Sequence, residues 1–209
     1  MADPLSVRSP HFADAPSSTP VLVLLHGYGS HEQDLPGITA WLPRHLPWIS
    51  FRAPLPMPGG GAAWFPLSLP DEPAQGPVDM ATSQLWEWLD AEVPERPLVP
   101  LGFSQGGLMA TQLLRTRPER IAATVMLAGF VTEDGSMPDE TLAQHQPEVF
   151  WGRGDRDSVI WLEAVHRTDA WLNTSTRATI RNYPNLGHAV NESELQDVAE
   201  FLTRVLAHR

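Results

Sequence analysis

A serine between glycines is the residue of this sequence whose surroundings most favour covalent chemistry. Residues 102–106 are Gly-Phe-Ser-Gln-Gly, which matches the Gly-x-Ser-x-Gly pattern of a nucleophile elbow. In such an elbow the serine stands on a tight turn between a strand and a helix, and the glycines let these two elements approach closely. An apolar run at 97–101 precedes Ser104, and a helix-like segment follows it. The pattern and its context therefore predict a serine nucleophile.

A serine of this kind needs a base and a carboxylate that orients the base. His188 follows the last predicted strand and precedes the last predicted helix, and the other histidines lack this context. Two aspartates, Asp155 and Asp157, lie in the loop after an earlier predicted strand, and we favour Asp157 because it lies further along that loop. Both loops follow the carboxyl ends of predicted strands, where ligands bind in open α/β sheets. Ser104, Asp157 and His188 are thus the predicted catalytic residues.

Two backbone N–H groups are expected to stabilise the oxyanion that forms when a serine attacks a carbonyl. One belongs to the residue after the nucleophile, Gln105, and the second comes from the loop after an early strand. Residues 26–29 of that loop are His-Gly-Tyr-Gly, and Tyr28 is the expected donor because the glycines let the loop come close. We expect His26 to brace the loop rather than to take part in catalysis.

The composition excludes several other kinds of chemistry. The sequence of 209 residues contains no Cys and no Lys, which rules out a thiol nucleophile, a disulfide, a Schiff base and a phosphate-binding lysine. The formal net charge of −11 argues against binding to nucleic acids or anionic membranes, because both need basic surfaces. No cofactor is expected. No metal is expected either, because the side chains that are suited by type to bind a metal match no known ligand spacing: His26, His31, Glu32 and Asp34.

Strands and helices alternate along the chain. Apolar runs predict strands at 20–27, 48–53, 97–102, 122–129, 148–152 and, more polar and at a sheet edge, 177–183. Helical spacing of apolar residues predicts helices at 33–46, 78–92, 158–172 and 195–206, besides the one after Ser104. This alternation predicts an α/β fold with a mostly parallel sheet of about six to seven strands and helices on both faces.

The segment 54–77 differs from the rest, because it holds seven prolines and three consecutive glycines. Long loops in compact domains are usually functional, and its apolar residues argue against a disordered linker. We therefore expect an ordered loop over the active site. We expect residues 1–19 to form an N-terminal arm or an edge strand. The connection between the strands at 122–129 and 148–152 is too short for a separate cap, so we expect one domain over residues 1–209.

Several motifs together resemble the carboxylesterase/phospholipase family of α/β hydrolases, the group that includes acyl-protein thioesterases. They span most of the chain, at 26–29, 34–35, 52–54, 64–65, 102–107, 154–157 and 187–188. The resemblance implies an α/β-hydrolase fold, the Ser104–Asp157–His188 triad and oxyanion donors at Tyr28 and Gln105. It also implies that the 54–70 loop forms part of an acyl-binding groove, with these candidate substrate-binding residues: Met57, Trp64, Phe65, Leu67 and Leu69.

Two positions depart from the family pattern. Ser158 stands where members often have Pro after the triad aspartate, and Tyr28 stands where eukaryotic thioesterases usually have Leu. We expect the first difference to be neutral, whereas the second bears on the acyl pocket and on thioesterase activity.

The expected activity is hydrolysis of carboxylic esters of short to medium acyl chains through an acyl-enzyme. Acyl-protein or acyl-CoA thioesterase, lysophospholipase and acyltransferase activities are the alternatives, and a catalytically silent ligand-binding protein is the alternative from another class. The expected partner is a small-molecule ester or thioester, without nucleic acid or stable membrane insertion. Eight tryptophans allow an apolar patch and hence a homodimer. A cytoplasmic location is expected, because neither a signal peptide nor a membrane-spanning stretch is visible.

Overall fold

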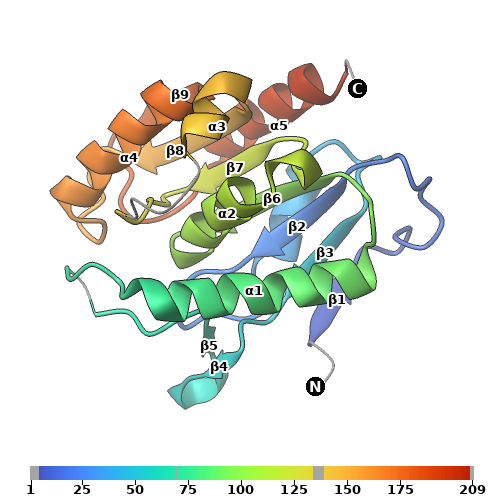
Figure 1. The fold of residues 1–209 in the computed structure, drawn as a ribbon, viewed down its shortest axis with the longest axis horizontal. Coiled ribbons are helices and arrows are strands. Elements are labelled where there is room, and N and C mark those ends of the chain that lie inside the picture. Colours follow the sequence, from blue (N-terminus) through green and yellow to red (C-terminus); the bar gives the residue numbers. More distant parts are fainter. Residues whose placement is uncertain (1–4, 69, 134–138, 208–209) are drawn as a thin grey trace.

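A seven-stranded sheet forms the centre of the fold (Figure 1). The computed structural model describes residues 5–68, 70–133 and 139–207. In spatial order the strands are β1 (Ser6–Arg8), β3 (Trp48–Phe51), β2 (Val21–Leu25), β6 (Leu98–Phe103), β7 (Thr124–Leu127), β8 (Glu148–Gly154) and β9 (Arg177–Tyr183). β1 runs antiparallel to β3, and all other neighbours are parallel. The predicted mostly parallel sheet is confirmed, with the polar strand β9 at its edge.

Helices cover both faces of this sheet, as predicted. They are α1 (Gln75–Glu92), α2 (Gln105–Thr116), α3 (Asp139–His145), α4 (Leu162–Ser175) and α5 (Glu192–Leu206), with the 3₁₀ helices η1 (Leu35–Trp41), η2 (Pro58–Gly60) and η3 (Pro118–Arg120). Residues of α1 to α4 join one apolar cluster, and residues of η1 and α5 join the other. In Figure 1, α1 and α2 lie in front of the sheet. Because both faces are covered, a central strand such as β2 is buried at every position.

The segment 33–46 forms the short 3₁₀ helix η1 in place of the predicted α-helix. Pro36 stands in the first turn, where its missing N–H costs no helical hydrogen bond, and Pro43 follows the end of η1, so few residues remain between them for regular α-helical turns. Leu35 and Leu42 nevertheless bury their side chains against the sheet. The apolar spacing thus identified Leu35 and Leu42 as buried, whereas Trp41 is exposed, and the prediction of an α-helix was wrong.

Helix α4 begins at Leu162, later than the predicted start at 158. The Asp157 carboxylate accepts the backbone N–H groups of Val159 at 2.9 Å and Ile160 at 3.2 Å, which holds the preceding segment in a turn. The short helix α3, between β7 and β8, is not predicted by the sequence pattern, because its seven residues are too few to show a helical period.

The proline-rich segment 54–77 contains a small hairpin and the start of α1. Strands β4 (Leu55–Pro56) and β5 (Ala62–Ala63) pair with each other and are joined by η2. The hairpin is tied to the loop after β2, because the Gly29 N–H donates to the Ala62 carbonyl at 2.9 Å and the Ala62 N–H donates to the Ser30 carbonyl at 2.8 Å. The segment is therefore attached to the loop that carries Tyr28.

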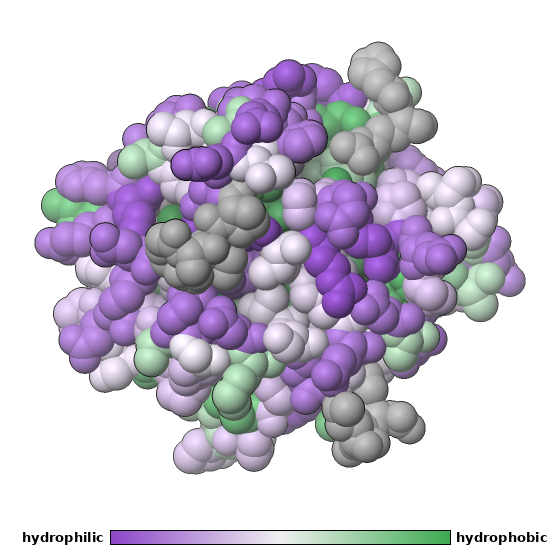
Figure 2. Space-filling view, viewed as in Figure 1, coloured by the Kyte–Doolittle hydropathy of each residue, from purple (hydrophilic) through white to green (hydrophobic). Residues whose placement is uncertain are grey.

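The tryptophans do not form the exposed apolar patch that their number suggested. Trp41, 40 % exposed, is the only tryptophan among the exposed large apolar side chains of the described residues. On the face shown in Figure 2 hydrophilic residues predominate and hydrophobic ones are scattered. None of the helices described here is long and apolar enough to cross a membrane. The homodimer stays a prediction, without a tryptophan surface to support it.

The turn from β6 into α2 is sharp, as expected of a nucleophile elbow. Ser104 has φ 54° and ψ −116°, a conformation that residues other than glycine rarely adopt. The Ser104 N–H donates to the Leu127 carbonyl at 2.9 Å, which fixes the turn to β7. A Cβ atom on Gly106 would overlap the carbonyl oxygen of Leu25, and one on Gly102 would overlap the carbonyl of Gly106. The glycines therefore allow α2 to pack directly on β2 and β6.

Gly106→Ala is expected to destabilise the fold by about 3 kcal/mol, because the added methyl group must displace α2 from β2. Chemical denaturation followed by tryptophan fluorescence measures this loss. Gly76→Ala is the matched control, since the same methyl group meets no atom within 4 Å in the first turn of α1. The control should change stability by less than about 1 kcal/mol, and equal effects of the two substitutions would contradict the close packing of α2.

Candidate active site

Three side chains from separate loops meet beside the elbow. The Oγ atom of Ser104 lies 2.8 Å from Nε2 of His188, and Nδ1 of His188 lies 2.8 Å from Oδ2 of Asp157. Because an ionised carboxylate can only accept, the Nδ1–H group of the neutral imidazole donates to Asp157. Nε2 then accepts the hydroxyl proton of Ser104. This is the arrangement of a serine with a general base and an orienting carboxylate.

Asp157 rather than Asp155 contacts the imidazole. Burial by itself would raise the pKa of the Asp157 carboxyl, but hydrogen bonds from His188 and from two backbone N–H groups outweigh burial and hold that pKa below its ordinary value. The carboxylate therefore stays ionised at neutral pH. Asp155 has a different part, because it accepts the backbone N–H of Asn185 at 2.7 Å and so braces the loop after β9.

The parallel sheet brings these residues to one edge. Ser104 follows the carboxyl end of β6, Asp157 follows that of β8, and His188 follows that of β9. The loop after β9 approaches β8 so closely that a Cβ atom on Gly154 would overlap the carbonyl oxygen of Leu186. Loops that follow parallel strands open on the same edge of a sheet, so residues far apart in the sequence can meet there.

Two backbone N–H groups are available beside Ser104. Tyr28 lines the same pocket as Ser104, and Gln105 is the first residue of α2. Over the described ranges of the chain, neither N–H donates a hydrogen bond to another residue. The first N–H groups of a helix have no partner within it, and such groups bind negatively charged oxygen well. Both groups can therefore donate to an oxyanion.

The side chain of Gln105 ties the elbow to the segment after β5. It is fully buried, its Oε1 atom accepts the Trp64 N–H at 2.9 Å, and its Nε2 atom donates to the Phe65 carbonyl at 2.7 Å. Nothing in the sequence motif indicates this role, because it depends on a segment about 40 residues away. Gln105 therefore links the elbow to the backbone of Trp64 and Phe65, two of the predicted substrate-binding residues.

His26 braces the loop that carries Tyr28, as predicted. Its Nδ1–H group donates to the Gly27 carbonyl at 2.8 Å, and its Nε2 atom accepts the Ala53 N–H at 3.0 Å. Its own carbonyl accepts the indole N–H of Trp64 at 2.9 Å. Burial lowers the pKa of His26, so the ring is neutral and suited to this donor–acceptor role.

A pocket of about 370 Å³ opens at Ser104 and His188. Leu67, Phe103 and Val159 provide apolar walls. The ring of Phe103 also contacts the imidazole of His188, with ring centroids 5.0 Å apart. The pocket is therefore an apolar recess that ends at the hydroxyl group and the imidazole.

Several pocket residues escape prediction from the sequence. Phe103 and Val159 lie next to the motif residues, and this proximity is the signal that could have found them. Ser30 and Asp34 form a polar part of the lining, joined by a hydrogen bond of 2.6 Å between their side chains. Their signal is weaker, because the loop after β2 holds many polar residues and the sequence does not show which of them face inward.

Two of the predicted substrate-binding residues belong to the core. Trp64 and Phe65 are at most 1 % exposed and do not line the pocket at Ser104, so their part in substrate binding stays a prediction. Large aromatic rings gain more from full burial than an open groove can offer, and both join the larger apolar cluster. Met57 precedes η2 in the hairpin and does not line the pocket either. Leu67 does line it, and Leu69 lies outside the described residues.

The four side chains considered as metal ligands, at positions 26, 31, 32 and 34, do not form a metal site in the described part of the structure. Within residues 5–68, 70–133 and 139–207, no three His, Asp or Glu side chains are close enough together to hold a metal ion. Glu32 instead forms an ion pair with Arg52 at 2.8 Å, and His26 is engaged in bracing its loop.

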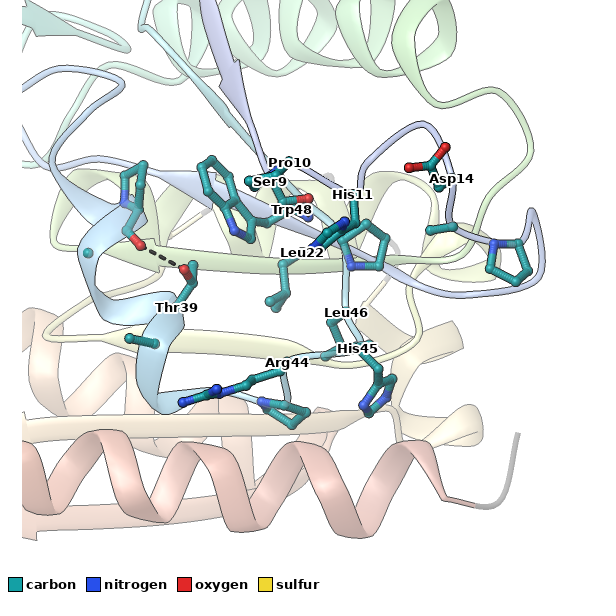
Figure 3. Close-up of a pocket in the computed structure, with 17 residues that line it drawn as sticks. Ser9, Pro10, His11, Asp14, Leu22, Thr39, Arg44, His45, Leu46 and Trp48 are labelled. Carbon is teal, nitrogen blue, oxygen red and sulfur yellow. Dashed lines mark hydrogen bonds between the residues drawn. The ribbon is translucent and has the colours of Figure 1, made fainter.

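A larger hollow, of about 860 Å³, lies away from Ser104 (Figure 3). Leu22 and Trp48, which line it, lie at the amino ends of β2 and β3, whereas Ser104 follows a carboxyl end. His45 and Arg44 reach it from the segment after η1. The size of a hollow therefore does not identify the reactive site in this molecule.

Nearly the whole chain matches one known protein family. The model of the phospholipase/carboxylesterase family matches residues 12–206. The chain belongs to this family. Its fold is that of the α/β hydrolases, and the crystal structure of esterase PE8 superposes with a TM-score of 0.80 over 98 % of this chain and 100 % of that one, at 23 % identity. Ser104, Asp157 and His188 follow one another along the sequence in the order nucleophile, carboxylate and base, which is the order typical of α/β hydrolases.

Two relatives differ in how much of the chain they match. Acyl-protein thioesterase 1 of Cryptococcus neoformans is 24 % identical over 97 % of this chain and 99 % of its own length. A pimeloyl-(acyl-carrier protein) methyl ester esterase of Aromatoleum aromaticum is 37 % identical, but it matches 52 % of this chain. The present chain covers 36 % of that second protein.

Asp157→Asn should weaken the fold in a pH-dependent manner. A carboxyl group whose pKa is lower in the folded state stabilises the fold above its unfolded pKa and loses this contribution as the pH falls through its folded pKa. The substitution should therefore lower the free energy of unfolding by about 1–3 kcal/mol at pH 7. The gap to the wild type should narrow as the pH falls below the ordinary aspartate pKa of about 4, as urea unfolding at a series of pH values would show.

Asp155→Asn is the matched control for this measurement. It removes the same charge from the same loop, but from an exposed carboxylate that does not contact His188. A gap that stays constant with pH in Asp157→Asn, or that closes equally in the control, would contradict the pairing of Asp157 with His188.

Proposed function

We propose that this protein is a serine esterase that hydrolyses carboxylic esters of short to medium acyl chains. The observation that carries the proposal is the pair of 2.8 Å hydrogen bonds from Ser104 to His188 and from His188 to Asp157, at the end of an apolar pocket. Membership of the phospholipase/carboxylesterase family supports the same activity.

In this mechanism Nε2 of His188 takes the proton of Ser104 while Oγ attacks the ester carbonyl. Asp157 keeps the imidazole in the required tautomer and stabilises the imidazolium that forms. The N–H groups of Tyr28 and Gln105 donate to the oxyanion, and loss of one such donor lowers kcat by about 10²–10³-fold in a serine protease. His188 then protonates the leaving alcohol. A water molecule, deprotonated by His188, hydrolyses the acyl-enzyme and restores Ser104.

The size of the pocket supports the preference for shorter acyl chains. Its volume of about 370 Å³ lies at the small end of ligand pockets. Leu67 and Val159 border the pocket, and Val159 is 38 % exposed, so the recess opens to solvent. A long acyl chain would have to leave part of its length in water.

Thioester hydrolysis is the second candidate, because the relative that matches 97 % of this chain is named an acyl-protein thioesterase. The same hydroxyl group, imidazole and oxyanion donors would serve for either leaving group. Tyr28 lines the pocket and is 43 % exposed, so it offers a bulky polar side chain at the mouth. Lysophospholipase and acyltransferase activities would share the acyl-enzyme, and a silent binding protein would not form it.

Ser104→Ala should lower kcat for a short-chain ester by at least about 10³-fold, because the nucleophile is lost. Ser30→Ala is the matched control, since Ser30 is a second serine in the same pocket whose hydroxyl donates to Asp34. The control should change kcat by less than about tenfold. Undiminished turnover in Ser104→Ala would refute the serine mechanism.

A series of p-nitrophenyl esters of increasing chain length tests the substrate class. We expect kcat/KM to be highest for short to medium chains and to fall beyond about twelve carbons, because the pocket cannot cover a longer chain. Steeply rising activity with long chains would contradict this. Matched thioesters in the same series give the ratio that separates esterase from thioesterase, and a ratio favouring thioesters at every length would replace the first candidate by the second.

A further inference from the structure

One buried carboxyl group has no part in the mechanism described above. Glu194, in the first turn of α5, is 0 % exposed, and neither of its oxygens has a hydrogen-bond partner among the described residues. Burial raises its pKa to about 8, and the negative charge of Asp197 adds to this rise. The backbone N–H of Asn191 is near the carboxyl group and partly opposes the rise, but it does not reach hydrogen-bond geometry with either oxygen. The carboxyl group is therefore protonated at pH 7 and ionises only in mildly alkaline solution.

The Glu194 carboxyl lies directly against β8. A Cβ atom on Gly152 would overlap its Oε1 atom, and the ring of Phe150 borders the same space. Glycine at this position therefore makes room for the carboxyl group between α5 and the sheet. A neutral carboxyl group tolerates such an apolar setting, whereas an ionised one is driven toward water.

The other titratable groups near Glu194 come from α5 and β9. Asp197 accepts the hydroxyl of Tyr183 at 2.7 Å and lies 3.7 Å from Arg181. Burial raises the pKa of Tyr183, so this hydroxyl stays protonated in mildly alkaline solution. On the β8 side the carboxyl faces Gly152 and a phenylalanine ring, which do not titrate. The neighbouring Asp197 therefore disfavours a negative charge on Glu194. The side chains that Asp197 itself contacts, Tyr183 and Arg181, are on β9.

Glu194 lies between the two segments that carry His188 and Asp157. Strand β8 leads past Gly152 to Asp157, and α5 begins shortly after His188. The N–H of Glu194 donates to the side-chain oxygen of Asn191 at 2.9 Å, which caps α5 and fixes the end of the His188 loop. A displacement of Glu194 would therefore move this cap and the loop attached to it.

We propose that the neutral carboxyl group of Glu194 is a positioning group, which seats the start of α5 on β8 and thereby holds His188 between Ser104 and Asp157. When the group ionises, it moves toward water, the start of α5 leaves Gly152, and His188 leaves hydrogen-bond reach of Ser104. The loss of activity rests on the proposed esterase function. The effect on folding stability does not depend on that function.

Glu194→Gln tests this role, because the amide has the size of the carboxyl group and cannot ionise. The measurement is kcat/KM for a short-chain ester between pH 6 and pH 10, corrected for spontaneous hydrolysis. With a pKa of about 8, the wild type should retain about one tenth of its activity at pH 9, where about nine tenths of Glu194 is ionised. Glu194→Gln should retain most of its pH 7 activity at pH 9.

Two further variants make the result specific. Glu192→Gln removes the same charge from the same turn at an exposed position, so it should follow the wild-type profile. Glu194→Met has a side chain of similar length without charge, and it should keep its activity at pH 9 even if the amide of Glu194→Gln disturbs the packing. Loss of activity at pH 9 in both Glu194 variants, in parallel with the wild type, would overturn the proposal.

Thermal unfolding tests the ionisation without any turnover. The raised pKa means that the proton on Glu194 stabilises the folded state at low pH, and this stability is lost as the pH rises toward the folded pKa of about 8. The Tm of the wild type should therefore fall between pH 6 and pH 9 relative to that of Glu194→Gln. Equal Tm profiles would overturn the proposal, and a Tm difference without an activity difference would overturn the positioning role. Absence of turnover at every pH would instead contradict the esterase function.

Discussion

The strained backbone at Ser104 is the constraint on which the rest of the site depends. A residue with a side chain stays at φ 54° and ψ −116° only when its surroundings leave it no alternative. Here the surroundings are α2, packed on β2 and β6 through Gly102 and Gly106. This packing sets the hydroxyl group at the carboxyl edge of the sheet. It also begins a helix whose first N–H groups have no partner within it, so the nucleophile and an oxyanion donor come from one turn.

The elbow is joined to the rest of the site by buried hydrogen bonds. The amide of Gln105 holds the backbone at Trp64 and Phe65, and the indole of Trp64 holds the carbonyl of His26. Buried polar groups of this kind cost free energy when a partner is lost, so the network resists displacement of any one member. The loop with Tyr28, the segment after β5 and the elbow therefore form one connected unit, which explains why the aromatic rings are in the core rather than in the pocket.

The sequence predicts the parts of the site that follow from topology. Ser104, Asp157 and His188 each follow a predicted strand, and the carboxyl ends of parallel strands share one edge of a sheet. What the sequence does not decide depends on which way a side chain faces. Spacing alone does not separate Asp157 from Asp155, since both lie in one loop and only Asp157 is directed at the imidazole.

The missed features have the same physical origin. An apolar ring in a proline-rich loop can face a groove or the core, and packing far from the motif put Trp64 in the core. In the sequence, Glu194 resembles any acidic residue in the first turn of a helix, where such residues are usually exposed. Its burial depends on Gly152, which lies on a strand about 40 residues earlier. Helix η1 is shortened by its prolines, whereas the longer helices α1 and α5 have enough residues to show their period.

Mass spectrometry of the protein during turnover can detect the covalent acyl intermediate that Ser104 should form. Wild-type protein mixed with excess p-nitrophenyl ester and quenched in acid within milliseconds should carry one acyl group, on the peptide that contains Ser104. We expect this mass increase to appear before the steady state and to disappear once the ester is consumed. Turnover with no acylated peptide, or with the acyl group on another residue, would contradict the serine mechanism.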